Sequence, residues 1–234
     1  MTITELRKRR GRLVLLMLDG EPAATVDIRT FEESPYRVGS SLSDEELKAL
    51  LEESSRRRAR EKAVYLLSRS DHSRRGLEEK LRREADPAIA AETAERMKEL
   101  GYVDDERYAY RLAEELTSRK LYPRRRALQE LCSRGVDREL AALAVEATEK
   151  DDLEKALELL AKKQYNRLHD EDGRRKAAAK LTRYGFDGGT VRRALSAWDE
   201  RAETATDEAD EAFAATAWNS DDLFDGVAAE DDGL

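Results

Sequence analysis

The chain has 234 residues, of which 40% are charged, 40% hydrophobic and only 6% aromatic. This length allows one or two domains, and a composition rich in Leu, Ala, Glu and Arg but poor in Pro is typical of a mainly helical protein with much solvated surface. The single cysteine, Cys132, excludes an intrachain disulfide and a multi-cysteine metal site, and we expect it to be a small core residue beside Leu131.

The opening residues lack the apolar segment of a signal peptide, and the longest apolar run, "LVLLML", is far shorter than the ~20 residues of a membrane helix. A cytoplasmic protein is therefore expected. The net charge of −8 conceals a division, because residues 199–234 hold 13 Asp and Glu against one Arg, a net charge of −12. Residues 1–198 hold 42 Lys and Arg against 38 Asp and Glu, a net charge of +4. The global charge thus says little about what the mildly basic body binds.

Residues 1–55 begin with strand character. Three short β-like runs, "ITELRKR", "RLVLLML" and "AATVDIR", predict a three-stranded meander packed on a helix. Asp19-Gly20 signals a hairpin turn, in a loop that Glu21-Pro22 is expected to lengthen. Ser43 and Glu46 form a capping box that opens a helix, and we expect this helix to continue through the polar segment 54–62.

An internal repeat organises the rest of the chain. Three segments align at an offset of 50 residues: "SRRGLEEKL" (73–81), "PRRRALQEL" (123–131) and "GRRKAAAKL" (173–181). Each opens with an arginine doublet and ends in leucine, so each predicts a helix with the doublet at its start. The segments "CSRGVD" and "TRYGFD" continue the second and third copies, which suggests glycine at helix C′ positions and Asp137 and Asp187 as N-caps.

The repeat predicts a mainly α fold: three tandem three-helix repeats forming an elongated curved solenoid, preceded by a small β-hairpin/meander-plus-helix module. The predicted divisions are a β-plus-helix module (1–55), three repeats (56–104, 105–150 and 151–198) and an acidic, disordered tail (199–234). The apolar stripes of the third helices are interpreted as core, and they comprise Ile89, Thr93, Met97 and Leu100; Leu140, Leu143 and Val145; and Val191, Leu195 and Trp198. Tyr102 and Val103 are expected to tuck into the turn after Gly101.

The sequence offers little catalytic chemistry. His72 and His169 fall near helix ends or in loops and are interpreted as plain surface residues, and the phosphate-loop pattern GxxxxGK[ST] is absent. The acidic pairs 104–105 and 151–152 each precede a helix, where Asp is by default an N-cap. We therefore expect no enzyme activity, no catalytic or metal-binding residues and no cofactor.

The arginine doublets favour binding. Each is predicted at a helix N-terminus, where the helix dipole disfavours cations by ~0.3–1 kcal/mol per charge at low salt. The forked guanidinium suits carboxylate or phosphate, so a partner with negative charge is expected, although the sequence leaves open nucleic acid or an acidic protein surface. A solvated face is the plain alternative.

Three segments, "YLLSRSDHSRRGLEEKL", "MKELGYVDDERYAYRLAEEL" and "RRRALQELCSRGVD", resemble the RecX family of bacterial proteins that modulate RecA. The resemblance covers about residues 60–198, and residues 1–55 are similar to the N-terminal module of many members. It implies a non-catalytic monomer that binds the RecA filament on single-stranded DNA, touches DNA weakly and does not bind membranes. It further implies inhibition of filament extension, ATPase, strand exchange and co-protease activity.

Carried onto this chain, the resemblance implies a partner-binding surface made of eight residues: Arg74, Arg75, Arg124, Arg125, Arg126, Arg174, Arg175 and Lys176. A helical repeat that binds nucleic acid without RecA is the alternative function. The tail is interpreted as a solubilising segment, with a partner motif anchored by Trp218, Leu223 and Phe224, or a cover over the arginines, as sharper alternatives.

Overall fold

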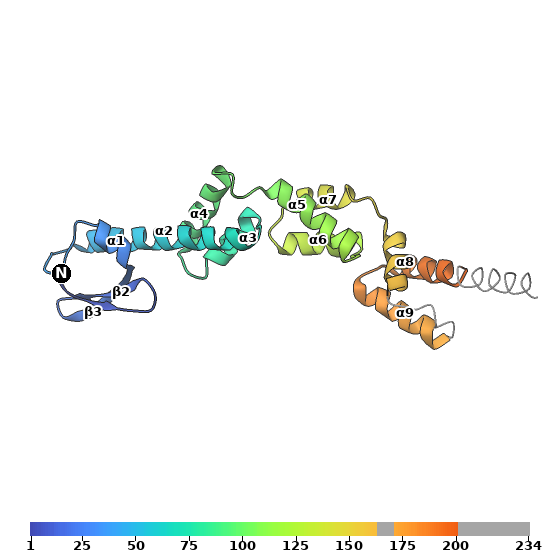
Figure 1. Ribbon diagram of the computed structural model, residues 1–234, viewed down its shortest axis with the longest axis horizontal. Coiled ribbons are helices and arrows are strands. Elements are labelled where there is room, and N and C mark those ends of the chain that lie inside the picture. The colour runs from blue at the N-terminus through green and yellow to red at the C-terminus, as the bar shows by residue number, and fades with distance from the viewer. Residues whose placement is uncertain (163–170, 201–234) are drawn as a thin grey trace, which may run out of the picture. The chain divides into compact units, whose positions relative to one another are not determined.

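The computed structural model describes residues 1–162 and 171–200, and Figure 1 shows their elements in chain order. Helices dominate this part of the chain and one small sheet lies in its N-terminal part, so the predicted mainly α fold is confirmed. The chain packs into two compact units. The first joins Met1–Glu115 to Leu128–Ala147, and the second joins Leu116–Ala127 to the described residues from Thr148 onward. His169 and all but the first two residues of the predicted tail lie outside the described part.

The predicted meander is an antiparallel sheet of order β1-β2-β3, formed by β1 (Ile3–Lys8), β2 (Leu13–Leu18) and β3 (Glu21–Asp27). Asp19 and Gly20 both have positive φ, 51° and 85°, as the type I′ two-residue hairpin requires. The loop is therefore shorter than predicted, because Glu21 and Pro22 already belong to β3. Proline is tolerated there because β3 is an edge strand and its register shifts beside Pro22.

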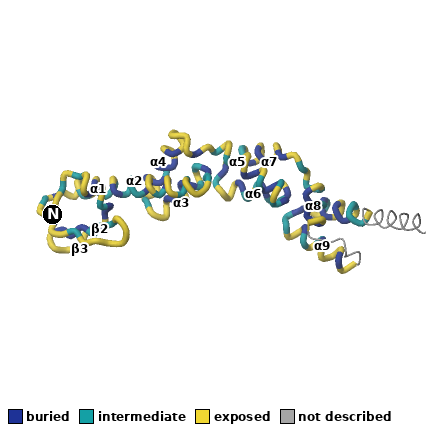
Figure 2. Tube along the Cα trace, viewed as in Figure 1, coloured by how far each residue is buried: buried dark blue, intermediate teal, exposed yellow. Residues whose placement is uncertain are grey.

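Two helices cover the sheet. Asp27 ends β3 and caps α1 (Ile28–Glu33), accepting hydrogen bonds from the backbone N–H groups of Arg29 and Thr30. This short helix was not predicted from the sequence. The longer α2 (Asp44–Arg69) begins with the predicted Ser43–Glu46 capping box and continues without a break through residues 54–62, as expected. The sheet, α1 and the first turns of α2 share one apolar core, visible as buried tube in Figure 2.

The helices that follow α2 carry the first two arginine doublets, the first in the first unit and the second in the segment of α6 that belongs to the second unit. They are α3 (Arg74–Leu81), α4 (Pro87–Glu99), α5 (Asp105–Glu114), α6 (Arg124–Ser133) and α7 (Arg138–Glu146). Residues 124–127 of α6 are assigned to the second unit. Leu77, Leu81 and Met97 belong to a buried cluster with small residues of α2 and α4, while α5 packs on α7. Asp86 caps α4, and the predicted N-cap Asp137 of α7 is confirmed.

The second unit starts in a π-helical turn, Glu115–Arg119, that continues α5. Leu121 follows with a φ of 55°, a conformation that costs a non-glycine residue ~1–2 kcal/mol. Its side chain is fully buried in a core with Leu160 of α8 (Asp152–Lys162) and Leu181 of α9 (Glu171–Tyr184), and this burial offsets the strain. A last helix spans residues 188–200 in the described part, and Asp187 caps it as predicted.

Four residues that the sequence predicts to be buried are exposed, so these predictions are wrong. Leu100 and Tyr102 are 49% and 63% exposed because α4 ends at Glu99 and Val103 fills the buried position after the turn. Leu143 is 57% exposed, since the buried line of α7 runs through Ala141, Ala144 and Val145. Cys132 is exposed because Ala127 and Leu131 define the buried face of α6 and the next residue turns away from it.

Candidate functional site

The arginine doublets of α3 and α6 begin helices whose N-termini receive carboxylates from the next repeat. The backbone N–H of Arg74 donates to Asp105 Oδ1 at 2.7 Å, and that of Arg124 donates to Asp152 Oδ1 at 3.0 Å. These carboxylates lie at the positive end of each helix, where they offset the charge of the arginines. Asp105 and Asp152 therefore offset the predicted destabilisation of each helix start by its two arginines.

The acidic pairs divide their roles between two helices. Asp104 caps its own helix α5 by accepting from the N–H of Arg107, and Asp151 does the same for the N–H of Glu154. The second Asp of each pair caps the helix of the preceding repeat instead. The sequence correctly predicts that these acidic pairs cap helices. It does not show that Asp105 and Asp152 bind the starts of α3 and α6, because these partners are 31 and 28 residues apart in the chain.

The starts of α3 and α6 also contact a glycine turn of the following repeat. In the first unit, Ser73 Oγ donates to the carbonyl of Arg134 at 2.6 Å and accepts from the N–H of Gly76. A Cβ atom on Gly76 would lie 2.8 Å from that carbonyl oxygen, so the close approach requires glycine there. The turn itself is built on Gly135, whose φ is 83°.

The equivalent junction of the second unit uses different chemistry. Arg126 occupies the position of Gly76, and its Nη1 donates to the carbonyl of Tyr184 at 2.9 Å. The guanidinium carbon lies 3.8 Å from the ring centre of Tyr122 and 5.3 Å from that of Tyr184. Arg126 is therefore held between two aromatic rings and a carbonyl, an arrangement that fixes the turn before Gly185.

The third doublet differs from its prediction. Helix α9 already includes Glu171 and Asp172, so Arg174 and Arg175 lie inside this helix and not at its start. Arg174 pairs with Asp199 at 2.7 Å, and both Arg175 and Lys176 pair with Asp172. The Lys176 ammonium, and then Arg175, hold the pKa of the Asp172 carboxyl below its usual range.

The structure thus divides the eight predicted partner-binding residues into those that already have an intramolecular partner and those that do not. Five already have partners, since Arg74 pairs with Glu78 at 3.0 Å and Arg126, Arg174, Arg175 and Lys176 are held as described above. The other three are Arg75, Arg124 and Arg125, and all three are exposed. Their side chains form no hydrogen bond or ion pair with residues 1–162 or 171–200, so they are the ones available to a partner.

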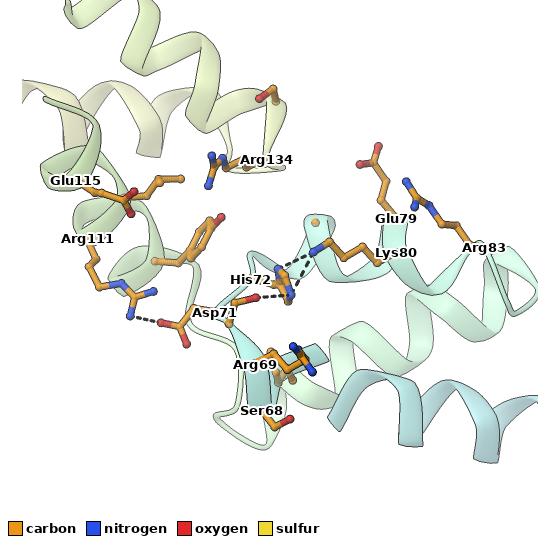
Figure 3. A pocket seen from close by; sticks show the side chains of 16 residues that line it. Ser68, Arg69, Asp71, His72, Glu79, Lys80, Arg83, Arg111, Glu115 and Arg134 are labelled. Carbon is orange, nitrogen blue, oxygen red and sulfur yellow. Dashed lines mark hydrogen bonds and ion pairs between the residues drawn. The ribbon is translucent and has the colours of Figure 1, made fainter. Parts of the chain in front are cut away.

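A groove that the sequence did not indicate lies in the first unit (Figure 3). It has a volume of about 1020 Å³ and is lined by five Arg and Lys side chains against three Asp and Glu, together with His72. The cations are Arg69, Lys80, Arg83, Arg111 and Arg134. They come from α2, α3 and the turn after it, α5, and the turn after α6, so no short motif contains them.

Other chemistry is limited in the described residues. They contain no group of three or more His, Cys, Asp and Glu side chains placed to hold a metal ion. Among the same residues, no helix is both long and apolar enough to span a bilayer.

Two segments of the chain match known family domains. Residues 59–105 match the first three-helix domain of RecX, and residues 104–145 match the second. The Regulatory protein RecX of Caldanaerobacter subterraneus subsp. tengcongensis is 33% identical over 150 residues, which cover 63% of this chain and 75% of the relative. That of Xanthomonas campestris pv. campestris (strain B100) is 35% identical over 139 residues, covering 56% and 82%. That of Clostridioides difficile is 29% identical over 204 residues, covering 84% and 94%.

Solved structures share the fold. A crystal structure of regulatory protein RecX superposes with a TM-score of 0.53 at 18% identity, covering 83% of this chain and 98% of that one. A structure of RecX from Lactobacillus salivarius gives a TM-score of 0.51 at 20% identity, covering 62% and 97%.

Proposed function

Because the chain belongs to the RecX family of regulatory proteins, we propose that it binds RecA and its nucleoprotein filament on single-stranded DNA. Binding inhibits filament extension, ATPase activity, strand exchange and co-protease activity, and so regulates DNA repair and recombination. The protein acts in the cytoplasm as a monomer and without catalysis. Family membership is the observation that carries this proposal.

The exposed arginines Arg75, Arg124 and Arg125 are proposed as the first contacts with the partner. Each is ready to make a charge-assisted, bidentate hydrogen bond without first giving up an intramolecular one, because none has a partner among the described residues. The five paired cations among the predicted residues are proposed as secondary contacts, since a partner's carboxylate or phosphate has to compete with Glu78, Asp172, Asp199 or the carbonyl of Tyr184.

The test is RecA ATPase activity on single-stranded DNA, measured with and without this protein. We expect the rate to fall at equimolar or lower concentrations of the protein, and an unchanged rate contradicts the proposal. Replacing Arg124 and Arg125 by Ala should raise the concentration needed for half inhibition by roughly tenfold, the effect of losing about 1.4 kcal/mol of binding.

The matched control is the double substitution Arg138→Ala with Arg192→Ala. Both residues are exposed helix arginines whose side chains make no hydrogen bond or ion pair in the described part of the chain, so the control removes the same charge elsewhere. If both double variants lose inhibition equally, net charge acts and not the doublet. DNA binding that occurs equally well without RecA, with no effect on the ATPase, favours the alternative of a nucleic-acid-binding helical repeat.

A further inference from the structure

The groove of the first unit contains a contact between two groups that do not attract each other when both are charged. Lys80 Nζ lies 3.4 Å from Nε2 and 3.5 Å from Nδ1 of His72 (Figure 3). No carboxylate in the described residues lies within ion-pair distance of Lys80. The ammonium therefore rests against the imidazole ring, with no counter-ion of its own.

The other charges around the groove are mostly accounted for. Arg111 pairs with Asp71, and Arg134 pairs with Glu130 at 2.7 Å. Arg69 donates to the hydroxyl of Tyr65 at 3.2 Å and stacks on its ring, while Arg83 has no ion-pair partner in the part of the chain that the structure describes. Lys80 and Arg83 thus place two positive charges beside His72, and Glu79, which lines the same wall, forms an ion pair with neither of them.

We propose that this groove binds a phosphate group through Lys80 and His72, with Arg83 at its edge, and that His72 takes up a proton when the phosphate binds. A phosphate oxygen accepts from the Lys80 ammonium and from the protonated imidazole, which relieves the contact between the two groups. The groove is larger than one phosphate ion requires and includes the ring of Tyr108 in its lining. It therefore has room for a whole nucleotide, either free as a nucleoside polyphosphate or within a single strand.

The sign of the proton linkage follows from the groups that face His72. Burial first, and then the Lys80 ammonium, hold the pKa of His72 below its ordinary value, while Asp71 opposes them. Ser70 Oγ lies 3.3 Å from Nε2. The other charged or titratable groups that line the groove are Arg69 of α2, Glu79 of α3, Arg83 after α3, Tyr108 and Arg111 of α5, Glu115 of the π-helical turn and Arg134 after α6. A bound anion favours the charged ring, so it raises the pKa of His72 and binding strengthens as the pH falls.

Fluorescence anisotropy with a labelled oligothymidylate tests the site in the absence of RecA. Phosphodiesters keep a fixed charge near neutral pH, so His72 is the expected source of any pH dependence from the groove. We expect Lys80→Gln to weaken binding by about tenfold, as for the loss of one charge-assisted hydrogen bond. Lys48→Gln is the control, because Lys48 is exposed on α2, outside the groove, and also lacks a partner among the described residues.

Adenosine triphosphate and inorganic phosphate, added as competitors and studied alone by calorimetry, distinguish a free nucleotide from a strand. Proton NMR of the two histidine rings gives a readout that does not depend on the source. The resonance that disappears in His72→Gln should titrate at a higher pH when any of the three probes is bound, with the other histidine as internal reference.

Affinity for the oligonucleotide should fall as the pH rises, by at most about tenfold per pH unit for one linked proton, and His72→Gln should abolish this slope. Lys80→Gln binding as tightly as Lys48→Gln, an unmoved His72 titration, or no binding of any probe each overturns the proposal. The inference does not rest on the proposed function, because RecA is absent from every assay. If the protein fails to inhibit RecA but still binds phosphate in the groove, only the proposed function is overturned.

Discussion

The three glycine turns offer a matched test of how tightly the repeats pack. Gly101, Gly135 and Gly185 each follow a helix with positive φ, of 75°, 83° and 105°. Each turn has the two hydrogen bonds of a Schellman motif, such as Val136 N–H to the Leu131 carbonyl and Gly135 N–H to the Cys132 carbonyl. Substitution by alanine therefore imposes a similar backbone penalty at all three, about 1–2 kcal/mol.

The surroundings of the three glycines differ. A Cβ atom at Gly101 meets nothing within 4 Å, and at Gly185 it would lie 3.4 Å from the Arg126 Cβ, an ordinary contact. At Gly135 it would lie 2.7 Å from the backbone nitrogen of Gly76, so α3 or the turn has to move. Overpacking of this kind costs a further 1–3 kcal/mol or so, which gives a total of about 2–5 kcal/mol for Gly135→Ala.

Urea unfolding followed by circular dichroism at 222 nm measures these differences. Gly101 and Gly135 lie in the same compact unit, so their variants are compared on one transition. We expect the free energy of unfolding to fall by at least ~1 kcal/mol more for Gly135→Ala than for Gly101→Ala, the lower end of the overpacking range. Equal losses would show that α3 does not pack against the Gly135 turn as closely as the structure has it.

Two further predictions concern side chains that the repeat makes look alike. Arg126→Ala should lower the free energy of unfolding by about 2 kcal/mol, through loss of the cation–π contact and of the hydrogen bond to Tyr184. Exposed Arg125→Ala should stay within about 0.5 kcal/mol of the parent, and equal effects in thermal or urea unfolding would contradict this. Asp105→Ala should cost about 1 kcal/mol by removing the acceptor of the Arg74 N–H at the start of α3, whereas Glu106→Ala, which also removes a first-turn carboxylate of α5, should cost less in the same assay.

The sequence predicts many elements of this fold correctly because these elements depend on interactions between residues that are close together in the chain. The Ser43–Glu46 box, the Asp19-Gly20 turn and the glycines at helix C′ positions follow from hydrogen bonds between residues a few positions apart. The positions of the repeated helices follow from the spacing of buried residues such as Leu81 and Leu131, which the 50-residue alignment brings into register. These signals require no knowledge of which elements pack together.

The roles of the individual arginines depend on the neighbours that packing brings. The doublets are alike in sequence, yet Arg74 pairs with Glu78, Arg174 pairs with Asp199, and the Arg125 side chain has no hydrogen bond or ion pair with a described residue. Arg126 aligns with Gly76 in the sequence, and only the position of Tyr184 in the structure shows that the Arg126 guanidinium binds the backbone carbonyl of Tyr184. The groove of Lys80 and His72 was missed for the same reason, since its walls come from four separate segments.

The capping of α3 by Asp105 and of α6 by Asp152 has a consequence for synthesis on the ribosome. Each helix follows its own residues out of the exit tunnel without the acceptor for its first N–H, which arrives 31 or 28 residues later. Until then the first N–H of α3 and of α6 lacks this acceptor beside two cations, although in α3 Ser73 already accepts from the N–H of Gly76. We therefore expect α3 and α6 to reach their full stability only when the following repeat has emerged, so that folding proceeds along the chain one repeat behind translation.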